Sequence, residues 1–328
     1  MFKACHPKKS WFAAALLSAV SLGAAAQTWP AKPVHILVAY AAGGSTDVVA
    51  RVFAPYYQRA WGQPVIIDNR PGAGGQIGAE AVAKSPPDGF LLLMTSAGGQ
   101  AAGPALYRKL NYDPVKDLVG VAPMGGAPNI FVVNPAVAAT SFRDFIALAR
   151  QNPGKLNYGS TGVGSGPQLA FEMLKSAAGI DVVHVPYKGD GPLHPALIAN
   201  EVQAAIISPQ LALAQVKAGK LRALATTGSS RYSALPDLPT IAEQGFPGVE
   251  YAPWVGLFAP AATPREIVNR VNAETAKIMT DPEIVKTYLP QWGLDPMVMS
   301  ADAFHARYLS EIETFKRVVR EAKIPLID

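Results

Sequence analysis

Short apolar segments alternate with helix-length amphipathic segments along most of this chain, and this alternation restricts the possible folds more than any other feature. The apolar segments are rich in Val, Ile and Leu and are bounded by Gly, Pro or Asn, as buried strands are. They lie at 34–40, 64–69, 90–96, 129–135, 156–161, 182–187, 202–208 and 221–227. Segments with helical spacing of apolar residues lie at 47–61, 76–84, 141–151, 168–178, 191–199 and 209–218. Strict alternation of strands and helices predicts parallel sheets with right-handed crossovers.

Two breaks divide this pattern, one near 121–128 and a longer, turn-rich one at 228–254. A last strand follows at 254–260, and helices are expected at 264–280, 282–289 and 301–322. The breaks predict a chain that leaves one α/β lobe, builds a second and returns to the first. The expected lobes comprise residues 27–122 plus 229–328, and residues 123–228.

The N-terminal residues are typical of an export signal. Lys3, Lys8 and Lys9 precede an uncharged apolar run that ends in small residues, which predicts a signal peptide at 1–26 with cleavage after Ala26. The run is shorter than the ~20 residues that a spanning helix needs, so a retained membrane anchor is the less favoured alternative. We therefore expect a soluble, exported protein.

Removal of this segment changes the charge balance and removes the only cysteine, Cys5. Three of the 29 basic residues leave with it and no acids do, so 26 basic residues face 24 acidic ones. With no basic tract, nucleic acid is not an expected partner. With no disulfide, stability has to come from a large core, which a chain of this length can supply.

Two glycine- and hydroxyl-rich loops follow predicted strands and precede predicted helices. They are AAGGSTD, ending at Asp47, and YGSTGVGSGPQ at 158–168. A helix start presents unpaired N–H groups and a partial positive charge, so both loops favour an anion. We expect Ser45 and Thr46 to contact a ligand. Asp47 would repel a bound anion and is expected chiefly to stabilise the helix start, unless it meets a ligand amine, hydroxyl or water.

Ser165 has two interpretations that the sequence leaves open. The segment Ser165-Gly166-Pro167-Gln168 fits a capping box with Pro in the first turn, and a serine in this position can equally contact a ligand. A third loop, PYKGDGP at 186–192, also follows a predicted strand.

Catalytic and cofactor motifs are missing from the sequence. There is no G-x-S-x-G nucleophile motif, no GxxxxGK[ST] phosphate loop, no complete G-x-G-x-x-G and no H-x-x-x-H pair. We therefore expect no enzyme activity, no cofactor and no metal. A Ser–His–Asp constellation assembled from distant residues stays open, because such triads are recognised by geometry.

At these loops the chain resembles the Bug family, named for Bordetella uptake genes, of substrate-binding receptors of tripartite tricarboxylate transporters. The resemblance rests on many colinear segments, among them GGSTDVVAR, GQPVIIDNRPGAGGQIGAEAVAKSPPDGF, PGKLNYGSTGVGS, HVPYKG, LPDLPTIAEQGFPG and WVGLFAPAATP. It implies a type II periplasmic-binding fold, with two doubly wound α/β lobes joined by two crossing segments around a ligand cleft. It also implies a periplasmic, monomeric receptor that delivers a small organic acid to membrane permease subunits. A sensor that signals to a membrane partner and an exported hydrolase are the alternatives.

The resemblance implies that two loops hold a ligand carboxylate. The positions that match are Gly43, Gly44, Ser45, Thr46 and Asp47, then Ser160, Thr161, Gly164 and Ser165, with Ser96 and Ala97 as further candidates. Tyr187 and Asp190 are expected to line the pocket. Tyr40 and His194 are further candidates for its lining.

The chain departs from the family pattern in places that would contact the rest of the ligand. Ala39-Tyr40-Ala41-Ala42 replaces a Pro-aromatic-Pro-Pro run, Gln168 replaces a common histidine, and Ala196 replaces a frequent aspartate. The ligand class therefore stays open among mono-, di- and tricarboxylates, amino acids and aromatic acids.

Overall fold

The computed structural model describes residues 29–328 together with Met1. The rest of the predicted export signal lies outside the described residues. Within the described part of the chain, no helix is long and apolar enough to cross a membrane.

The first sheet has five strands in the order β2-β1-β3-β10-β4. The strands are β1 (Val34–Val38), β2 (Val65–Asn69), β3 (Leu91–Ser96), β4 (Leu118–Gly126) and β10 (Trp254–Pro260). Its helices are α1 (Ser45–Trp61), α2 (Gln76–Ala83), α8 (Arg265–Met279) and α10 (Ala301–Glu321). Alternate residues of β1 explain the two-sided packing, because Ile36 packs with α1 and α8 while Leu37 packs with α2 and α10.

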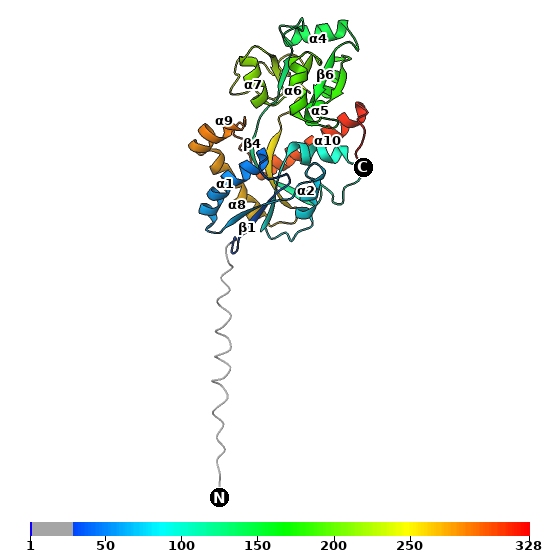
Figure 1. Ribbon diagram of the computed structural model, residues 1–328. Helices are drawn as coiled ribbons and strands as arrows, with labels where there is room; N and C mark the ends of the chain where they lie inside the picture. The colour runs from blue at the N-terminus through cyan, green and yellow to red at the C-terminus, as the bar shows by residue number, and fades with distance from the viewer. Residues whose placement is uncertain (2–28) are drawn as a thin grey trace.

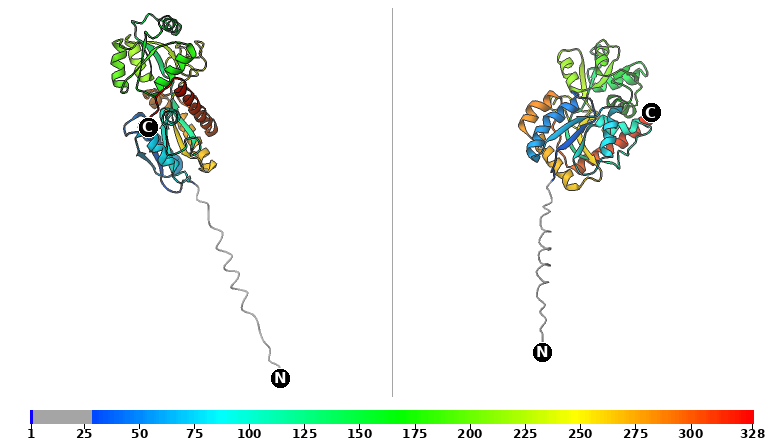
Figure 2. Two further views of the ribbon diagram at one scale, coloured as in Figure 1. Left: turned by 90° about the vertical axis from the view of Figure 1, so that its right-hand side faces the viewer. Right: turned by 60° about the horizontal axis from the view of Figure 1, so that its bottom comes forward.

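The second sheet also has five strands, in the order β7-β6-β8-β5-β9. The strands are β5 (Ile130–Val133), β6 (Asn157–Ser160), β7 (Val183–Pro186), β8 (Ala204–Ile207) and β9 (Arg222–Thr226). Its helices are α4 (Phe142–Gln151), α5 (Gly166–Ala178), α6 (Asp190–Ile198) and α7 (Pro209–Lys217). Figure 1 shows this second lobe in green above a first lobe built from the blue N-terminal and the yellow-to-red C-terminal segments. Figure 2 shows the same two lobes from other sides.

Short helical segments connect these elements in the first lobe. They are η1 (Ala73–Gly75), η2 (Gly98–Ala102), α3 (Gly103–Leu106), η3 (Ile284–Tyr288) and α9 (Leu289–Gln291). The segment 98–106 was not predicted, and the predicted helix at 282–289 is divided between η3 and α9.

The prediction of purely parallel sheets is wrong for two strands. β10 is antiparallel to β3 and β4, and β5 is antiparallel to β8 and β9, whereas β1 with its neighbours and β6 with its neighbours are parallel. The reason is where the chain enters each sheet. β5 and β10 are the first strands after a crossing between lobes, so each begins at the edge that faces the other lobe and runs away from it.

Two crossing segments join the lobes and are hydrogen-bonded to each other. The first is short, because β4 continues to Gly126 and β5 begins at Ile130; the second runs from β9 to β10. The Ala127 N–H donates to the Pro253 carbonyl (3.1 Å), and the Tyr251 N–H donates to the Thr227 carbonyl (2.7 Å). The predicted break near 121–128 is thus largely a strand, and the predicted lobe boundary between 122 and 123 falls inside β4. The exact division into lobes stays a prediction.

Candidate ligand-binding site

A cavity of about 660 Å³ lies between the two lobes, where loops from both sheets meet. Its first-lobe lining consists of Tyr40, Gly44, Thr46, Val49, Ser96 and the segment Trp292–Leu294. Its second-lobe lining consists of Asp190 and Ser208–Leu211, and the crossing segments contribute Ala127, Asn129, Pro253, Trp254 and Val255. The carboxyl ends of β3 and β8 both reach this cavity, which is where open α/β sheets bind ligands.

Two smaller hollows, of about 330 and 430 Å³, lie along α10 and α5. Ala97, a predicted contact, lines the first of them and is almost fully buried. Neither hollow includes the loop after β1 or the loop after β8, so we assign the candidate site to the larger cavity.

The start of α1 forms one wall of this cavity. Gly43 adopts a positive φ of 82°, which a residue with a Cβ rarely takes, and Gly44 is the N-cap residue. Because the first N–H groups of a helix have no intrahelical acceptor, the turn that begins at Ser45 presents donors and a partial positive charge at this wall. Thr46 is 5% exposed and lines the cavity.

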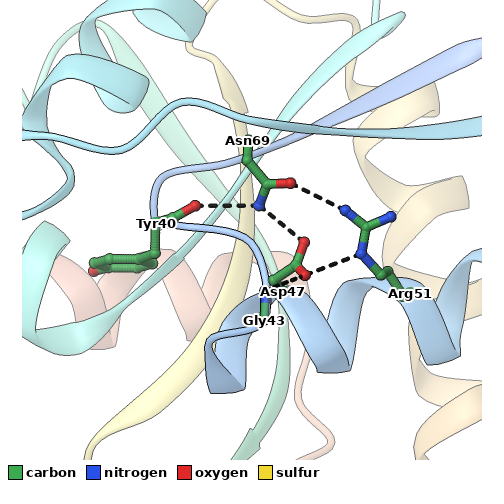
Figure 3. Close-up of polar contacts among 5 residues, drawn as sticks. All are labelled: Tyr40, Gly43, Asp47, Arg51 and Asn69. Atoms are coloured by element: carbon green, nitrogen blue, oxygen red, sulfur yellow. Dashed lines mark hydrogen bonds and ion pairs between the residues drawn. The ribbon is translucent and has the colours of Figure 1, made fainter.

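Asp47 lies behind this wall and is 2% exposed. Figure 3 shows its polar contacts with Gly43, Arg51 and Asn69. Its carboxylate accepts hydrogen bonds from the Gly43 N–H (2.8 Å), from Arg51 Nε (2.9 Å) and from Asn69 Nδ2 (2.8 Å). Burial raises the pKa of Asp47, but these hydrogen bonds, led by that of Arg51, outweigh it and leave the pKa below its ordinary value. Asn69 also donates to the Tyr40 carbonyl (3.1 Å), so one network holds both ends of the loop. Asp47 is not among the residues that line the cavity.

Tyr40 and Ser96 form a hydroxyl pair beside the α1 start. Tyr40 Oη lies 2.7 Å from Ser96 Oγ, and both residues line the cavity. Tyr40 thereby belongs to the candidate site, at the position where the family pattern differs.

The loop after β6 makes a closed internal network instead of lining the cavity. Ser160 is fully buried, and its Oγ lies 2.7 Å from His184 Nε2 and 3.0 Å from the Gly162 carbonyl. The Gly164 N–H donates to Gln168 Oε1 (2.6 Å), which leaves Gln168 Nε2 to donate to His184 Nδ1 (3.1 Å). His184 therefore carries its proton on Nε2 and donates it to Ser160. Burial lowers the pKa of His184, which keeps the ring neutral.

The capping-box interpretation of Ser165 is wrong. Ser165 precedes α5, but within residues 29–328 its side chain makes no cap hydrogen bond, and its Oγ is buried without a partner. Gln168 is committed to Gly164 and His184 instead. A Cβ placed on Gly164 would lie 2.9 Å from Leu106 Cδ2, so this loop packs against α3 of the first lobe. Thr161 and Ser165 consequently stand outside the cavity lining.

The loop that leads into α6 brings Asp190 to the cavity but not Tyr187. Burial raises the pKa of Asp190, and nearby His194 opposes this shift. Tyr187 is half-buried and packs with the residues beneath α6 and α7. His194 Nε2 is buried and has no hydrogen-bond partner in the described chain.

Sequence reasoning missed several lining residues. Asn129 and Ser208 stand side by side at the cavity edge of the second sheet, because the register pairs Ile130 with Ile207. Ser208-Pro209-Gln210 follows a strand and starts a helix, as Ser165-Gly166-Pro167 does. This pattern could have identified Ser208 as a candidate lining residue from the sequence. Trp254 and Trp292 also line the cavity and give it two aromatic side chains.

The chemistry of the lining favours hydrogen bonding over ion pairing. Of the described residues that line the cavity, none is Lys, Arg or His, and Asp190 is the single acid. Within 29–328 there is also no group of three or more His, Cys, Asp or Glu placed to hold a metal ion. The cavity offers N–H groups, hydroxyls and the side-chain amides of Asn129 and Gln210 among apolar walls.

Two α/β lobes, two crossing segments and a donor-lined cavity between them define a two-lobed ligand-binding receptor. The family model described as tripartite tricarboxylate transporter family receptor matches residues 49–324, and this chain belongs to that family. The resemblance identified in the sequence is confirmed.

Individual relatives agree with this assignment. The Bordetella pertussis protein BugT is 35% identical over 297 residues, which cover 90% of this chain and 91% of BugT. An R. palustris protein solved with adipate is 34% identical, with a TM-score of 0.73 over 91% of this chain and all of that one. MatC from Rhodopseudomonas palustris, solved with bound malate, is 30% identical, with a TM-score of 0.69 over 89% of this chain and all of that one.

Proposed function

We propose that this protein is a periplasmic, non-enzymatic receptor that captures a small carboxylate and delivers it to the membrane permease subunits of a tripartite tricarboxylate-type transporter. The observation that carries the proposal is the start of α1, which directs helix N–H groups and the Thr46 side chain at a cavity between two lobes. The relatives solved with adipate and malate support a carboxylate as the ligand. Capture by a single, monomeric chain is sufficient, because both walls of the cavity come from it.

In this proposal the ligand carboxylate lies against the first lobe. The Ser45 and Thr46 N–H groups and the Thr46 hydroxyl are the donors, and the Gly43 and Gly44 backbone forms the turn that leads into them. The Tyr40–Ser96 hydroxyl pair lines the same cavity. Asp47 acts indirectly, because its bond to the Gly43 N–H keeps the loop in the conformation that presents these donors. The paired crossing segments then allow the lobes to close on the ligand.

On the second lobe, Ser165 is proposed as a ligand contact and Asp190 as a residue that discriminates among ligands by charge. Asp190 already lines the cavity. The buried Ser165 Oγ lacks a partner in the described chain, and an unpartnered buried hydroxyl is costly enough to call for a water or a ligand oxygen. Since this hydroxyl is buried and its neighbour Gly164 packs against Leu106 of α3, the contact requires the loop to shift relative to the first lobe as the lobes move.

Binding without turnover fits the polar groups better than hydrolysis does. The Ser160–His184 pair has the spacing of a nucleophile and its base, but Ser160 is fully buried and His184 presents an N–H to it instead of a free lone pair. The third group is the amide of Gln168, which cannot stabilise an imidazolium as a carboxylate does. This network serves the structure of the loop.

The test is a binding screen of the mature protein against adipate, malate, succinate, citrate, glutamate, benzoate and hexanoate. Trp254 and Trp292 line the cavity, so ligand entry should change the intrinsic fluorescence, and calorimetry gives the affinity. A bound acid at a hundred times its Kd should also stabilise the fold by about 2.7 kcal/mol. If no carboxylate changes fluorescence, heat or melting temperature, the proposed function is wrong.

A further inference from the structure

We propose that the cavity contains a second polar subsite, formed by the start of α7 and the side-chain amide of Asn129, which binds an acceptor group at the far end of the same ligand. The ligand class that fits is an acid with an apolar middle and a second carboxylate or carboxamide. This inference rests on the proposed function and goes beyond the carboxylate contact at α1.

The first observation is the position of the two groups. Ile130 of β5 pairs with Ile207 of β8, so Asn129 and Ser208 are neighbours at the edge of the second sheet. Both line the cavity, together with Pro209, Gln210 and Leu211 from the first turn of α7. The α1 start belongs to the other lobe, so the two helix starts reach the cavity from opposite sides.

The second observation is that Asn129 is buried and its amide is unused. The residue is 6% exposed, and its backbone is fully paired: its N–H donates to Thr227 Oγ1 (2.9 Å), and its carbonyl accepts from the Thr227 N–H (2.9 Å). Its side-chain amide has no hydrogen bond to any of residues 29–328, although it lines the cavity. An amide at the cavity wall that makes no hydrogen bond to the protein is free to bind a group that the ligand or water supplies.

The third observation is the set of free donors at the α7 start. Ser208 is the N-cap residue, and its side chain makes no cap hydrogen bond within the described chain. Pro209 has no N–H, and the Leu211 and Ala212 N–H groups donate to the Ser208 carbonyl (3.2 and 3.0 Å). The Gln210 N–H and the Ser208 hydroxyl therefore remain as donors at the positive end of the helix, beside Asn129.

Apolar side chains line the same cavity as the two helix starts. Val49, Val255, Leu211 and Trp254 all line the cavity, so the middle of the ligand meets hydrocarbon and aromatic surface. Because no lining residue of the described chain is cationic, the second subsite binds through N–H and O–H donors, which donate equally to a carboxylate or to an amide carbonyl. A ligand with a hydrogen-bond acceptor at each end and methylenes between them can bind the donors at the starts of both α1 and α7.

The experiment compares three probes of equal chain length: adipate, its monoamide and hexanoate. Calorimetry on the mature protein should give adipate and the monoamide an affinity at least about tenfold above that of hexanoate, because hexanoate ends in a methyl group. The comparison is repeated with the pairs from succinate to suberate and their matched monoacids, so the result does not depend on one chain length.

Two substitutions locate the effect. Asn129→Leu keeps the approximate volume without a donor and should reduce the advantage of the diacid over hexanoate to less than about threefold. Asn129→Asp puts a carboxylate at the same place and should weaken adipate more than its monoamide. If Asn129→Leu does not fold, as judged by circular dichroism, Ser208→Ala serves instead, because it removes only a hydroxyl.

The possible outcomes separate the two hypotheses. Equal affinity of the native protein for diacids and their monoacids overturns the second subsite and leaves the receptor proposal intact. Equal weakening of all three probes by Asn129→Leu, or by Ser208→Ala in its place, also overturns the subsite, because it shows a general structural role. If neither diacids nor monoacids bind, the proposed function fails, and the inference that rests on it fails too.

Discussion

The loops after β1 and after β6 have the same sequence design, but the structure uses them differently. Each has glycines and hydroxyl residues between a strand and a helix. The loop after β1 lines the interlobe cavity through Gly44 and Thr46, whereas the loop after β6 satisfies its own polar groups and packs against Leu106. The start of α7 lines the cavity as well. A local pattern therefore predicts a helix start, while its surroundings decide whether that start is free to bind.

The largest expected effect concerns Asp47, which holds the β1 loop open to the cavity. Asp47→Ala leaves the Gly43 N–H, Arg51 and Asn69 without their shared acceptor, and it should destabilise the fold by about 3 kcal/mol. Urea unfolding measures this loss. Asp144 is a matched control, because it is an exposed first-turn acid in the capping box of α4; Asp144→Ala should cost about 1 kcal/mol.

The contribution of Asp47 to the stability of the fold should decrease as the pH falls. Its folded-state pKa is depressed, so its stabilisation is complete above the ordinary value of 3.8 and is lost as the pH falls toward the folded-state pKa. The stability gap between the native protein and Asp47→Ala should therefore narrow in acid. A gap that is unchanged there would show that the carboxylate charge is not what stabilises the loop.

The next effect distinguishes the two serines of the β6 loop. Ser160→Ala removes the partner of His184 and of the Gly162 N–H from a fully buried network, and it should destabilise the fold by about 1–3 kcal/mol. Ser165→Ala removes a hydroxyl with no partner in the described chain, so the apo protein should lose little stability.

Ligand affinity gives the complementary measurement for this pair. Ser165→Ala should weaken the binding of whichever acid the screen identifies by about 0.5–2 kcal/mol, the range for a lost hydrogen bond. Unchanged affinity by calorimetry, with the fold intact, would show that Ser165 does not contact the ligand. In that case the β1 loop would bind the ligand and the β6 loop would not.

Much of the fold could be predicted from periodicity, because each helix and strand buries one face locally. Apart from β4 and the helical segment 98–106, the strands and helices of both lobes were expected within a few residues of where they lie. Ser45–Trp61 forms one helix although Pro55 is inside it. The direction of β5 and β10 could not be predicted in this way, since it depends on the edge at which the chain enters a sheet. The same holds for the first crossing segment, whose apolar residues look like a loop but mostly belong to β4.

The site was predictable only where one segment supplies it. Gly44, Thr46, Ser96 and Asp190 were expected and line the cavity. Asn129 and Ser208 were missed, because they become neighbours through the pairing of strands far apart in sequence. The role of Asp47 likewise depends on Asn69, which the end of β2 brings beside it. These contacts depend on how strands far apart in the sequence pair, and no local pattern encodes that pairing.

A smaller effect tests whether the α1 start contacts the ligand. Thr46→Val keeps the shape of a 5% exposed side chain and removes its hydroxyl, so acid affinity should fall by about 1 kcal/mol, or roughly fivefold. Calorimetry measures the loss, and Thr161→Val, in the loop that does not line the cavity, is the matched control. Equal losses of acid affinity in the two variants would contradict the proposal that the β1 loop contacts the ligand and the β6 loop does not line the cavity.

The smallest effect concerns Asp190, the one charged residue in the described cavity lining. Its pKa is raised by burial, so the fraction that is protonated grows as the pH falls through a value above the ordinary 3.8. An ionised Asp190 repels a ligand carboxylate through a partly hydrated space, where the interaction is worth about 0.5–1 kcal/mol. Asp190→Asn should therefore raise the affinity for a plain diacid such as adipate by roughly twofold to fivefold at neutral pH.

The same substitution should act in the opposite direction on an amino acid. An ammonium group gains from an ionised carboxylate, so Asp190→Asn should weaken glutamate while it strengthens the unsubstituted glutarate. Measuring both ligands at pH 5 and at pH 8 separates the charge of Asp190 from any change in the shape of the cavity, because only a charge effect reverses its sign between the two ligands. A loss of affinity for both would show that Asp190 supports the second-lobe wall and does not discriminate among ligands by charge.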